Sequence, residues 1–155
     1  MSRAPTPDFR SMPGHLIRRA QQISGALFAE ECGALDLTAV QYAALAAIAA
    51  NADLDATRLS EQIAFDRSTI GGVLERLEAK GWIARRGSPE DRRVKLLDLT
   101  PDGRDVLKRV GPAVARVQKR LLEPFAPGDR EVFMRLLTEL TGAHAATGAP
   151  AEPRE

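Results

Sequence analysis

Residues 66–81 read DRSTIGGVLERLEAKG, and their apolar side chains recur at three- and four-residue spacing. That spacing places them on one face of a helix. The inward-facing residues are Ile70, Val73, Leu74 and Leu77. We expect the helix to begin after Asp66, whose carboxylate can cap the first N–H groups, and to end at Lys80-Gly81, where glycine can adopt the left-handed conformation.

The opposite face of this helix is left with small and polar side chains. It carries Ser68, Thr69, Gly71, Gly72, Glu75 and Arg76. Each glycine inside a helix costs about 1 kcal/mol relative to alanine. Two adjacent glycines on an outer face therefore indicate that another molecule comes close, and a DNA groove would fit. The alternative is a solvated face with a local kink.

A short helix is predicted on one side of this segment and a hairpin on the other. Residues 56–63 form the short helix, with Leu59 and Ile63 facing inward. After Gly81, residues 82–99 contain an apolar lead-in, a turn cluster at residues 87–91 and a second strand. Two short helices followed by a basic hairpin predict a winged helix-turn-helix.

The hairpin tip is strongly charged. It reads Glu90-Asp91-Arg92-Arg93. An arginine on a narrow loop fits the A·T-rich minor groove, whose potential is strongly negative. An adjacent acid can hold the guanidinium through charge-assisted hydrogen bonds. The alternative is a charged tip that only keeps the hairpin soluble.

Longer helices flank this unit. One is predicted over residues 13–31, and the next opens at Thr38 with Gln41 completing a capping box. After the hairpin, Thr100-Pro101 begins a long helix with an apolar stripe, and a last helix follows Pro127. The stripe of the long helix is Val106, Val110, Val114, Val117 and Leu121; the last helix carries Val132, Phe133, Leu136, Leu137 and Leu140. The fold class is mostly α, with the α+β element of a winged helix.

Composition narrows the function classes. The 155 residues are 44% hydrophobic and only 5% aromatic, so an aromatic platform that stacks single-stranded bases is not expected. The net charge is +1, which excludes a globally basic surface. Residues 76–95 nevertheless hold seven Lys or Arg against three Asp or Glu. This local excess indicates an element that faces a polyanion.

The chemistry-bearing residues are few. A single cysteine, Cys32, excludes an internal disulfide, and the two histidines, His15 and His144, fit no zinc pattern. No nucleophile–base pair, phosphate loop or metal cluster is present, so we predict neither an enzyme nor a cofactor. The N-terminal residues lack the apolar segment of a signal peptide, and the longest apolar run, residues 42–50, is far shorter than a membrane span. These features favour a cytoplasmic protein without a membrane partner.

A series of short motifs resembles the MarR family of bacterial transcriptional regulators. The motifs are LTAVQY (residues 37–42), LSE (59–61), DRSTI (66–70), LEAKG (77–81), PEDRR (89–93) and LTPDG (99–103). Each motif is weak alone, but their order is specific. The resemblance covers residues 16–140.

The resemblance implies an obligate homodimer on a pseudo-palindromic double-stranded DNA site. The dimerisation helices would be residues 13–34 and 101–144, and the winged helix-turn-helix would be residues 35–100. A flexible arm (1–12) would precede these regions and a flexible tail (145–155) would follow them. The residues expected to contact DNA are Arg67, Ser68, Thr69, Gly71, Gly72, Arg76, Asp91, Arg92 and Arg93. Many family members carry a larger polar or basic residue where Gly71-Gly72 stands, so base readout is expected to fall more on Ser68, Thr69 and Arg76.

Family members commonly bind small anionic aromatics between the dimer region and the winged helix. Here His15, Arg18 and Arg19 cluster on one side of the first predicted helix, beside an apolar stripe. Arginine can bind a carboxylate bidentately while the stripe holds the ring. We therefore predict an aromatic acid effector, with a nicotinate-type hydroxy acid as the specific guess. The alternatives are that these side chains snorkel or pair with acids across the dimer.

Tyr42 is a further candidate lining residue of the effector pocket, with a core tyrosine as the alternative. The prediction is thus a ligand-responsive homodimeric repressor. Two other functions stay open. One is a winged-helix module for protein–protein contact, and the other is a redox-sensing regulator that uses Cys32.

Overall fold

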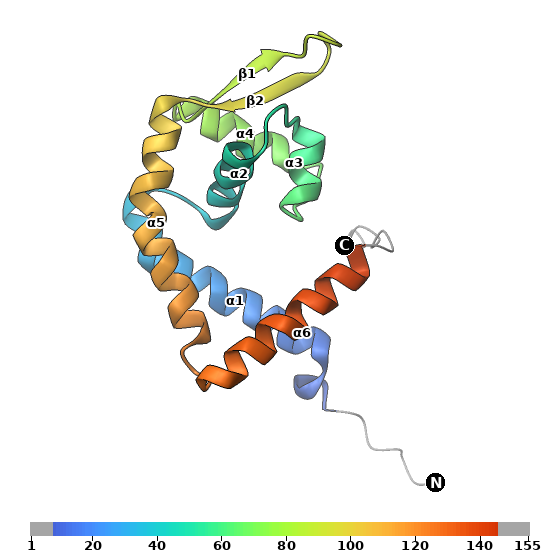
Figure 1. The fold of residues 1–155 in the computed structure, drawn as a ribbon, viewed down its shortest axis with the longest axis vertical. Coiled ribbons are helices and arrows are strands. Elements are labelled where there is room, and N and C mark those ends of the chain that lie inside the picture. The colour runs from blue at the N-terminus through green and yellow to red at the C-terminus, as the bar shows by residue number, and fades with distance from the viewer. Residues whose placement is uncertain (1–7, 146–155) are drawn as a thin grey trace.

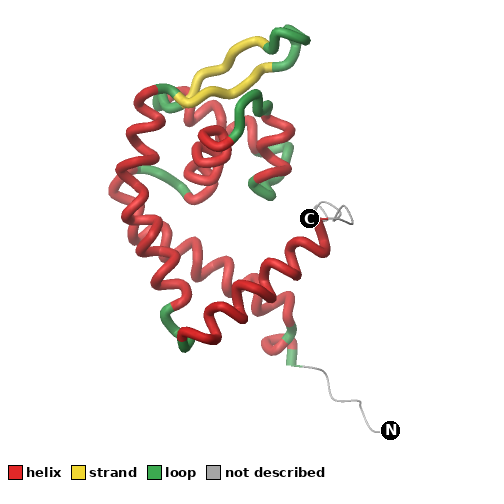
Figure 2. The backbone as a smooth tube through the Cα atoms, viewed as in Figure 1, coloured by secondary structure: helices red, strands yellow, loops and turns green. Residues whose placement is uncertain are grey.

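The structure is a computed structural model in which residues 8–145 are described. A winged-helix unit built from α2, α3, α4 and the two-stranded hairpin lies at one end (Figure 1). The long helix α5 descends from it beside α1, and α6 turns away from the lower end of α5 (Figures 1 and 2). The elements are η1 (Phe9–Ser11), α1 (Pro13–Cys32), η2 (Gly33–Leu35), α2 (Ala39–Ala50), α3 (Ala56–Gln62), α4 (Ile70–Ala79), β1 (Ile83–Gly87), β2 (Lys95–Leu99), α5 (Pro101–Leu122) and α6 (Pro127–Ala145).

The helix starts predicted from capping residues are confirmed at two positions. The Gln41 N–H donates to Thr38 Oγ1, and the Gln41 side chain accepts from the Thr38 N–H, both at 3.2 Å. Thr100 caps α5 by accepting the Gly103 N–H at 3.0 Å, with Pro101 in the first turn. These bonds satisfy N–H groups that have no partner inside their helix.

For the helix predicted to begin after Asp66, the start is wrong by three residues. α4 begins at Ile70, its N-cap Thr69 makes no side-chain capping bond, and residues 67–69 form a turn. Asp66 stabilises that turn: its carbonyl oxygen accepts the N–H groups of Thr69 and Ile70, and its carboxylate accepts the Ser68 hydroxyl. Because the Asp66 carboxylate binds the Ser68 hydroxyl, it does not cap the helix as the sequence predicts.

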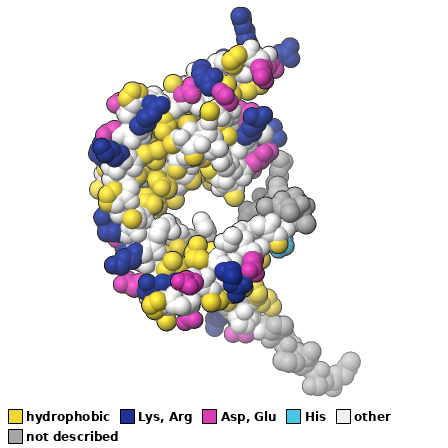
Figure 3. Space-filling view, in the orientation of Figure 1, with side chains coloured by type: hydrophobic (Ala, Val, Ile, Leu, Met, Phe, Trp, Pro, Cys, Tyr) yellow, Lys and Arg dark blue, Asp and Glu magenta, His cyan; other side chains and the backbone are white. Residues whose placement is uncertain are grey.

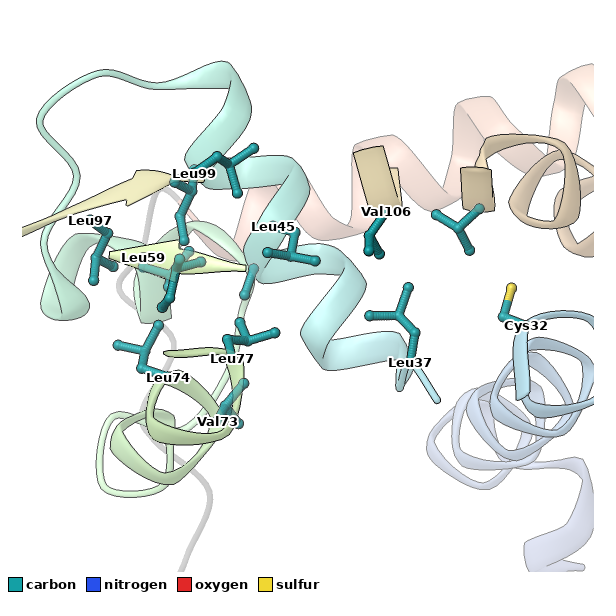
Figure 4. Packing of buried hydrophobic residues seen from close by; sticks show 14 of the residues in the cluster. Cys32, Leu37, Leu45, Leu59, Val73, Leu74, Leu77, Leu97, Leu99 and Val106 are labelled. Carbon is teal, nitrogen blue, oxygen red and sulfur yellow. The ribbon is translucent and has the colours of Figure 1, made fainter. Parts of the chain in front are cut away.

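One hydrophobic core joins the winged helix to the α1–α5 pair (Figure 4). Its largest fully buried side chains are Leu45, Leu59, Leu74, Leu77, Leu97, Val110, Val117 and Cys32. They come from the winged helix and also from α1 and α5. The winged helix and the long helices are therefore packed as one body rather than joined by a linker.

Charged side chains reinforce the α1–α5 contact. The Glu31 carboxylate accepts bonds from Arg116 Nε at 2.7 Å and from Arg120 Nη1 at 3.0 Å. Arg120 also reaches Glu30 at 2.8 Å. The hydrogen bonds from Arg116 and Arg120 lower the pKa of Glu31, so this carboxylate stays ionised beside them.

The junction between α4, β1 and α5 centres on Thr100. Its hydroxyl donates to the Gly81 carbonyl at 2.6 Å, and its N–H donates to the Trp82 carbonyl at 3.1 Å. Gly103 lies against the same Trp82 carbonyl, so closely that an added Cβ would stand 2.0 Å from the oxygen. We call this arrangement the Thr100 junction. Only glycine fits at position 103.

Among residues 8–145, no single helix combines the length and the apolar composition needed to cross a membrane. α1 with η2, taken together with α2, passes a test of length and composition, but that pair bends by 75°.

We predict that Gly103→Ala destabilises the protein by about 1–3 kcal/mol, because the methyl group has to displace backbone at the Thr100 junction. Gly72→Ala is the control, since a Cβ there meets nothing within 4 Å. The control should gain about 1 kcal/mol from helix propensity alone. Urea unfolding of both variants measures the difference. A Gly103→Ala protein as stable as the wild type would contradict this account of the junction.

Candidate nucleic-acid interface

The recognition element consists of the turn at residues 67–69 and the outer face of α4. Ile70, Val73, Leu74 and Leu77 are buried, as their spacing predicted. The exposed side holds Arg67, Ser68, Thr69, Gly71, Gly72, Glu75 and Arg76. Ser68 and Thr69 lie in the turn before the helix rather than on its face, which corrects the sequence-based placement.

The turn is held by its own hydroxyls. Ser68 donates to the Asp66 carboxylate, and Thr69 Oγ1 donates to the Asp66 carbonyl at 3.1 Å. Within residues 8–145, neither Arg67 nor Arg76 forms an ion pair. Two free guanidinium groups therefore flank a pair of glycines, and the surface above Gly71 and Gly72 is open. This geometry suits close approach of an anionic backbone.

The hairpin forms the wing, with β1 and β2 antiparallel and Gly87 paired to Lys95. Basic side chains project at the tip (Figure 3). The Asp91 carboxylate accepts the backbone N–H of Arg93 at 2.9 Å. Asp91 therefore shapes the backbone of the tip, whereas the sequence suggested that it holds a guanidinium. Arg92 and Arg93 are exposed and form no ion pair with any described residue.

Three of the seven cations in residues 76–95 are engaged in internal ion pairs. Lys80 lies 3.0 Å from the Asp36 carboxylate, and Arg85 lies 3.1 Å from that of Glu78. Arg86 reaches Asp53 at 2.6 Å and Asp98 at 2.7 Å, and these hydrogen bonds raise its pKa. The cations left for a polyanion are Arg76, Arg92, Arg93 and Lys95.

Arg86 is the residue that sequence reasoning missed. It links the wing to the loop between α2 and α3, beside a backbone hydrogen bond from Leu97 N–H to the Leu54 carbonyl at 2.9 Å. The hairpin register pairs Ala84 with Asp98, which makes Asp98 a diagonal neighbour of Arg86. We call the ion pairs of Arg86 with Asp53 and Asp98 the Arg86 brace. The pair with Asp98 follows from the sequence once the register is known, but the pair with Asp53 does not.

The candidate effector residues are not brought together within one chain. His15, Arg18 and Arg19 lie on the N-terminal half of α1, where the His15 ring packs edge-on against Phe9 at 5.2 Å and Arg19 donates to Gln22 at 2.8 Å. We call these three residues the α1 basic cluster.

Tyr42 belongs to a different part of the molecule. It is half-buried on α2, with its ring 6.0 Å from that of Phe28. Phe28 is thirteen residues beyond His15 on α1, roughly 20 Å along a helix. Within one chain Tyr42 packs against the core, which is the alternative given for it, and its place in the effector pocket stays a prediction.

Two cavities lie elsewhere in the described region. One, of about 370 Å³, is lined by residues of α2, β2 and α5. The other, of about 330 Å³, lies between α1 and the start of α2, beside Phe28. Neither lining includes the α1 basic cluster or Tyr42. Residues 8–145 hold no group of three His, Cys, Asp or Glu side chains that could bind a metal ion.

The model of the MarR family matches residues 35–94, which run from the start of the winged helix to the wing tip. This chain belongs to the MarR family. It is accordingly related to DNA-binding winged-helix transcriptional regulators, as the order of its motifs predicted.

Individual relatives agree with this assignment. The chain is 28% identical over 133 residues to the transcriptional repressor NicR of Pseudomonas putida, covering 86% of this chain and 84% of NicR. It resembles the solved structure of Bordetella bronchiseptica BpsR, whose DNA binding is regulated by 6-hydroxynicotinic acid, with a TM-score of 0.83, 31% identity, and coverage of 89% and 98%. The repressor CouR, bound to a 23-mer DNA duplex, gives a TM-score of 0.80 at 28% identity, with coverage of 90% and 99%.

We predict that replacing Arg92 and Arg93 by alanine weakens binding to specific and random duplexes together. Each lost phosphate contact should lower the slope of log affinity against log salt by about 1. Fluorescence anisotropy at several salt concentrations measures that slope. The matched control is Lys108→Ala/Arg109→Ala, which removes the same charge from the exposed side of α5. An unchanged slope in the wing variant would remove the wing from the interface.

Proposed function

We propose that this MarR-family repressor acts as a homodimer on a pseudo-palindromic operator and is released by a small aromatic carboxylate. The observation that carries the proposal is the exposed apolar surface of the terminal helices. Soluble chains rarely leave contiguous apolar surface uncovered unless it is an interaction site.

That surface is formed by α6 and the N-terminal half of α1. On α1, Leu16 is 54% exposed, and on α6 Leu136 is 50% exposed. The other exposed large side chains on these two helices are Ile17, Ile23, Val132, Met134, Leu137 and Leu140. A second copy presents the same helices, so a two-fold arrangement covers both surfaces at once. Residues 13–34 and 101–144 are the dimerisation helices in this proposal.

The dimer presents two recognition elements to the DNA. We assign contacts to Arg67, Ser68, Thr69, Gly71, Gly72, Arg76, Asp91, Arg92 and Arg93. Among these, Ser68, Thr69 and Asp91 act through the backbone shape that their hydrogen bonds hold, and the free arginines supply the charge. A winged helix used only for protein contact would not need several arginines without ion pairs beside the exposed Gly71 and Gly72.

The effector class follows from the α1 basic cluster together with the relatives. The regulation of BpsR by 6-hydroxynicotinic acid shows that a protein with this fold responds to a hydroxylated heteroaromatic acid. Here the cluster adjoins the exposed Leu16 and Ile17 on helices that we assign to the dimer interface. A carboxylate bound there would lie between protomers and bias their spacing.

Redox sensing through Cys32 is disfavoured by its surroundings. The Cys32 side chain is fully buried, and burial, followed by the charge of Glu31, raises the pKa of its thiol. A raised pKa lowers the thiolate fraction, which is the form that oxidants attack. Cys32 serves as a core residue between α1 and α5.

We predict that Leu136→Glu/Leu140→Glu converts a dimer into a monomer, because it places two charges on the exposed apolar surface of α6. Sedimentation should give about twice 16.8 kDa for the wild type, as a dimer requires, and about 16.8 kDa for the variant. Thr138→Glu, on the opposite side of α6, is the control and should remain dimeric. A wild-type monomer that binds its operator at full affinity would refute the dimer.

We predict that an acid of the hydroxybenzoate or hydroxynicotinate type releases the operator. A ligand that binds the DNA-incompatible conformation about 100-fold better shifts the balance by roughly 2.7 kcal/mol per site. Calorimetry and operator displacement with a panel of such acids test this on the wild type, Arg19→Ala and His15→Ala. If both variants bind and respond like the wild type, the α1 basic cluster is not the site. If no acid binds, the effector class is wrong while DNA binding stands.

A further inference from the structure

We infer that the winged helix carries a second site for a small acid, in the cavity between α2, β2 and α5. The inference rests on the proposed function only for the general class of ligand. The cavity has a volume of about 370 Å³, within the range of small-molecule pockets. It is lined by Ile48, Ala49, Asn51, Ala52, Asp98, Leu99, Arg104 and Leu107, none of which belongs to the α1 basic cluster.

The floor of the cavity is apolar. Ile48 from α2 and Leu99 from β2 are buried, at 5% and 8% exposure, and Leu107 from α5 is half-buried. Ala49 and Ala52 add only methyl groups, which leaves room for a flat ring above the floor. A ring placed there loses water contact on one face, and this favours binding in proportion to the apolar area covered.

The rim holds one free cation, Arg104, on the first turns of α5. Arg104 is exposed and forms no ion pair with any residue of the described range 8–145. Two nearby acids are engaged elsewhere: Asp105 pairs with Arg109 at 3.5 Å, and Asp98 pairs with Arg86 at 2.7 Å. A guanidinium without a carboxylate partner beside an apolar floor is suited to bidentate binding of a ligand carboxylate.

The rest of the rim offers acceptors. One Asp98 oxygen, Oδ2, accepts from Arg86, which leaves Oδ1 able to accept another bond. The Asn51 amide nitrogen donates to the Ala47 carbonyl at 2.8 Å, so its oxygen remains available. A plain carboxylate would meet the Asp98 charge without compensation. A ligand that also carries a hydroxyl or ring N–H away from its carboxylate satisfies both sides of the rim.

The site therefore selects a hydroxylated aromatic or heteroaromatic monocarboxylate over its unsubstituted parent. The cavity connects the wing strand β2 to α2 and to the start of α5. Asp98 belongs to the Arg86 brace of the wing, and Arg104 follows the Thr100 junction by one turn. A ligand that engages both residues biases the wing relative to α5.

The test is calorimetry on the full-length protein with 4-hydroxybenzoate, 6-hydroxynicotinate and benzoate. We expect Arg104→Gln to lose one of the wild-type binding events, or to weaken it by about tenfold or more, because hydrogen bonds to charged groups are lost. Lys108→Gln is the matched control, with the same charge change one turn along α5, and should bind like the wild type. Benzoate should bind the Arg104-dependent site more weakly than 4-hydroxybenzoate does.

The outcomes separate this inference from the proposed function. Loss in Arg104→Gln with normal binding in Arg19→Gln supports the cavity and refutes the α1 basic cluster. Loss in Arg19→Gln with wild-type binding in Arg104→Gln overturns the cavity and keeps the cluster. Equal binding of benzoate and 4-hydroxybenzoate overturns the inferred role of the Asp98 rim. Absence of binding by any of the three acids overturns the cavity and the effector class together, and operator binding then still tests the repressor.

Discussion

The hydroxyl of Thr100 fixes the positions of α4, the wing and α5 relative to one another. It donates to the carbonyl of Gly81, directly after the recognition helix, and accepts the N–H of Gly103, at the start of α5. The backbone N–H of Thr100 donates to the carbonyl of Trp82, the residue before β1. The recognition helix α4, the wing and α5 thus meet at Thr100. Glycine is required at position 103 because the Trp82 carbonyl lies where a Cβ atom of residue 103 would be. A displacement of α5 has to move α4 and the wing with it.

A second contact ties the recognition helix to the other long helix. Lys80, at the end of α4, pairs with Asp36 in the segment after α1 and lies over the Trp82 ring at 4.6 Å. Asp36 is held in a left-handed conformation, with φ of 50°, which aspartate tolerates better than most residues. The end of α4 is therefore anchored to both the segment after α1 and the start of α5.

Sequence patterns predicted the parts of this structure that depend on local chemistry. The Thr38 capping box, the Thr100-Pro101 helix start, the inward face of α4 and the charged hairpin tip are each set by residues within a few positions of one another. What the patterns missed is the partner that a polar or charged side chain selects. Asp66 binds Ser68 rather than capping α4. Tyr42, on α2, packs beside Phe28, which lies about 20 Å along α1 from His15. The charge excess of residues 76–95 was real, but three of its cations serve internal ion pairs that no one-dimensional count reveals.

The first turn of α4 has a further consequence for how this protein meets DNA. It begins without a side-chain cap, and two of its first three residues are glycines, so the chain is less committed to the helical conformation there than in any capped helix described above. Backbone amides in such a turn exchange their hydrogens with solvent more readily than those of the buried Leu74–Leu77 face. In the interface proposed above, ordering this turn on a duplex would cost conformational entropy. The contacts of this turn would then add less net affinity than the same contacts made from a capped helix.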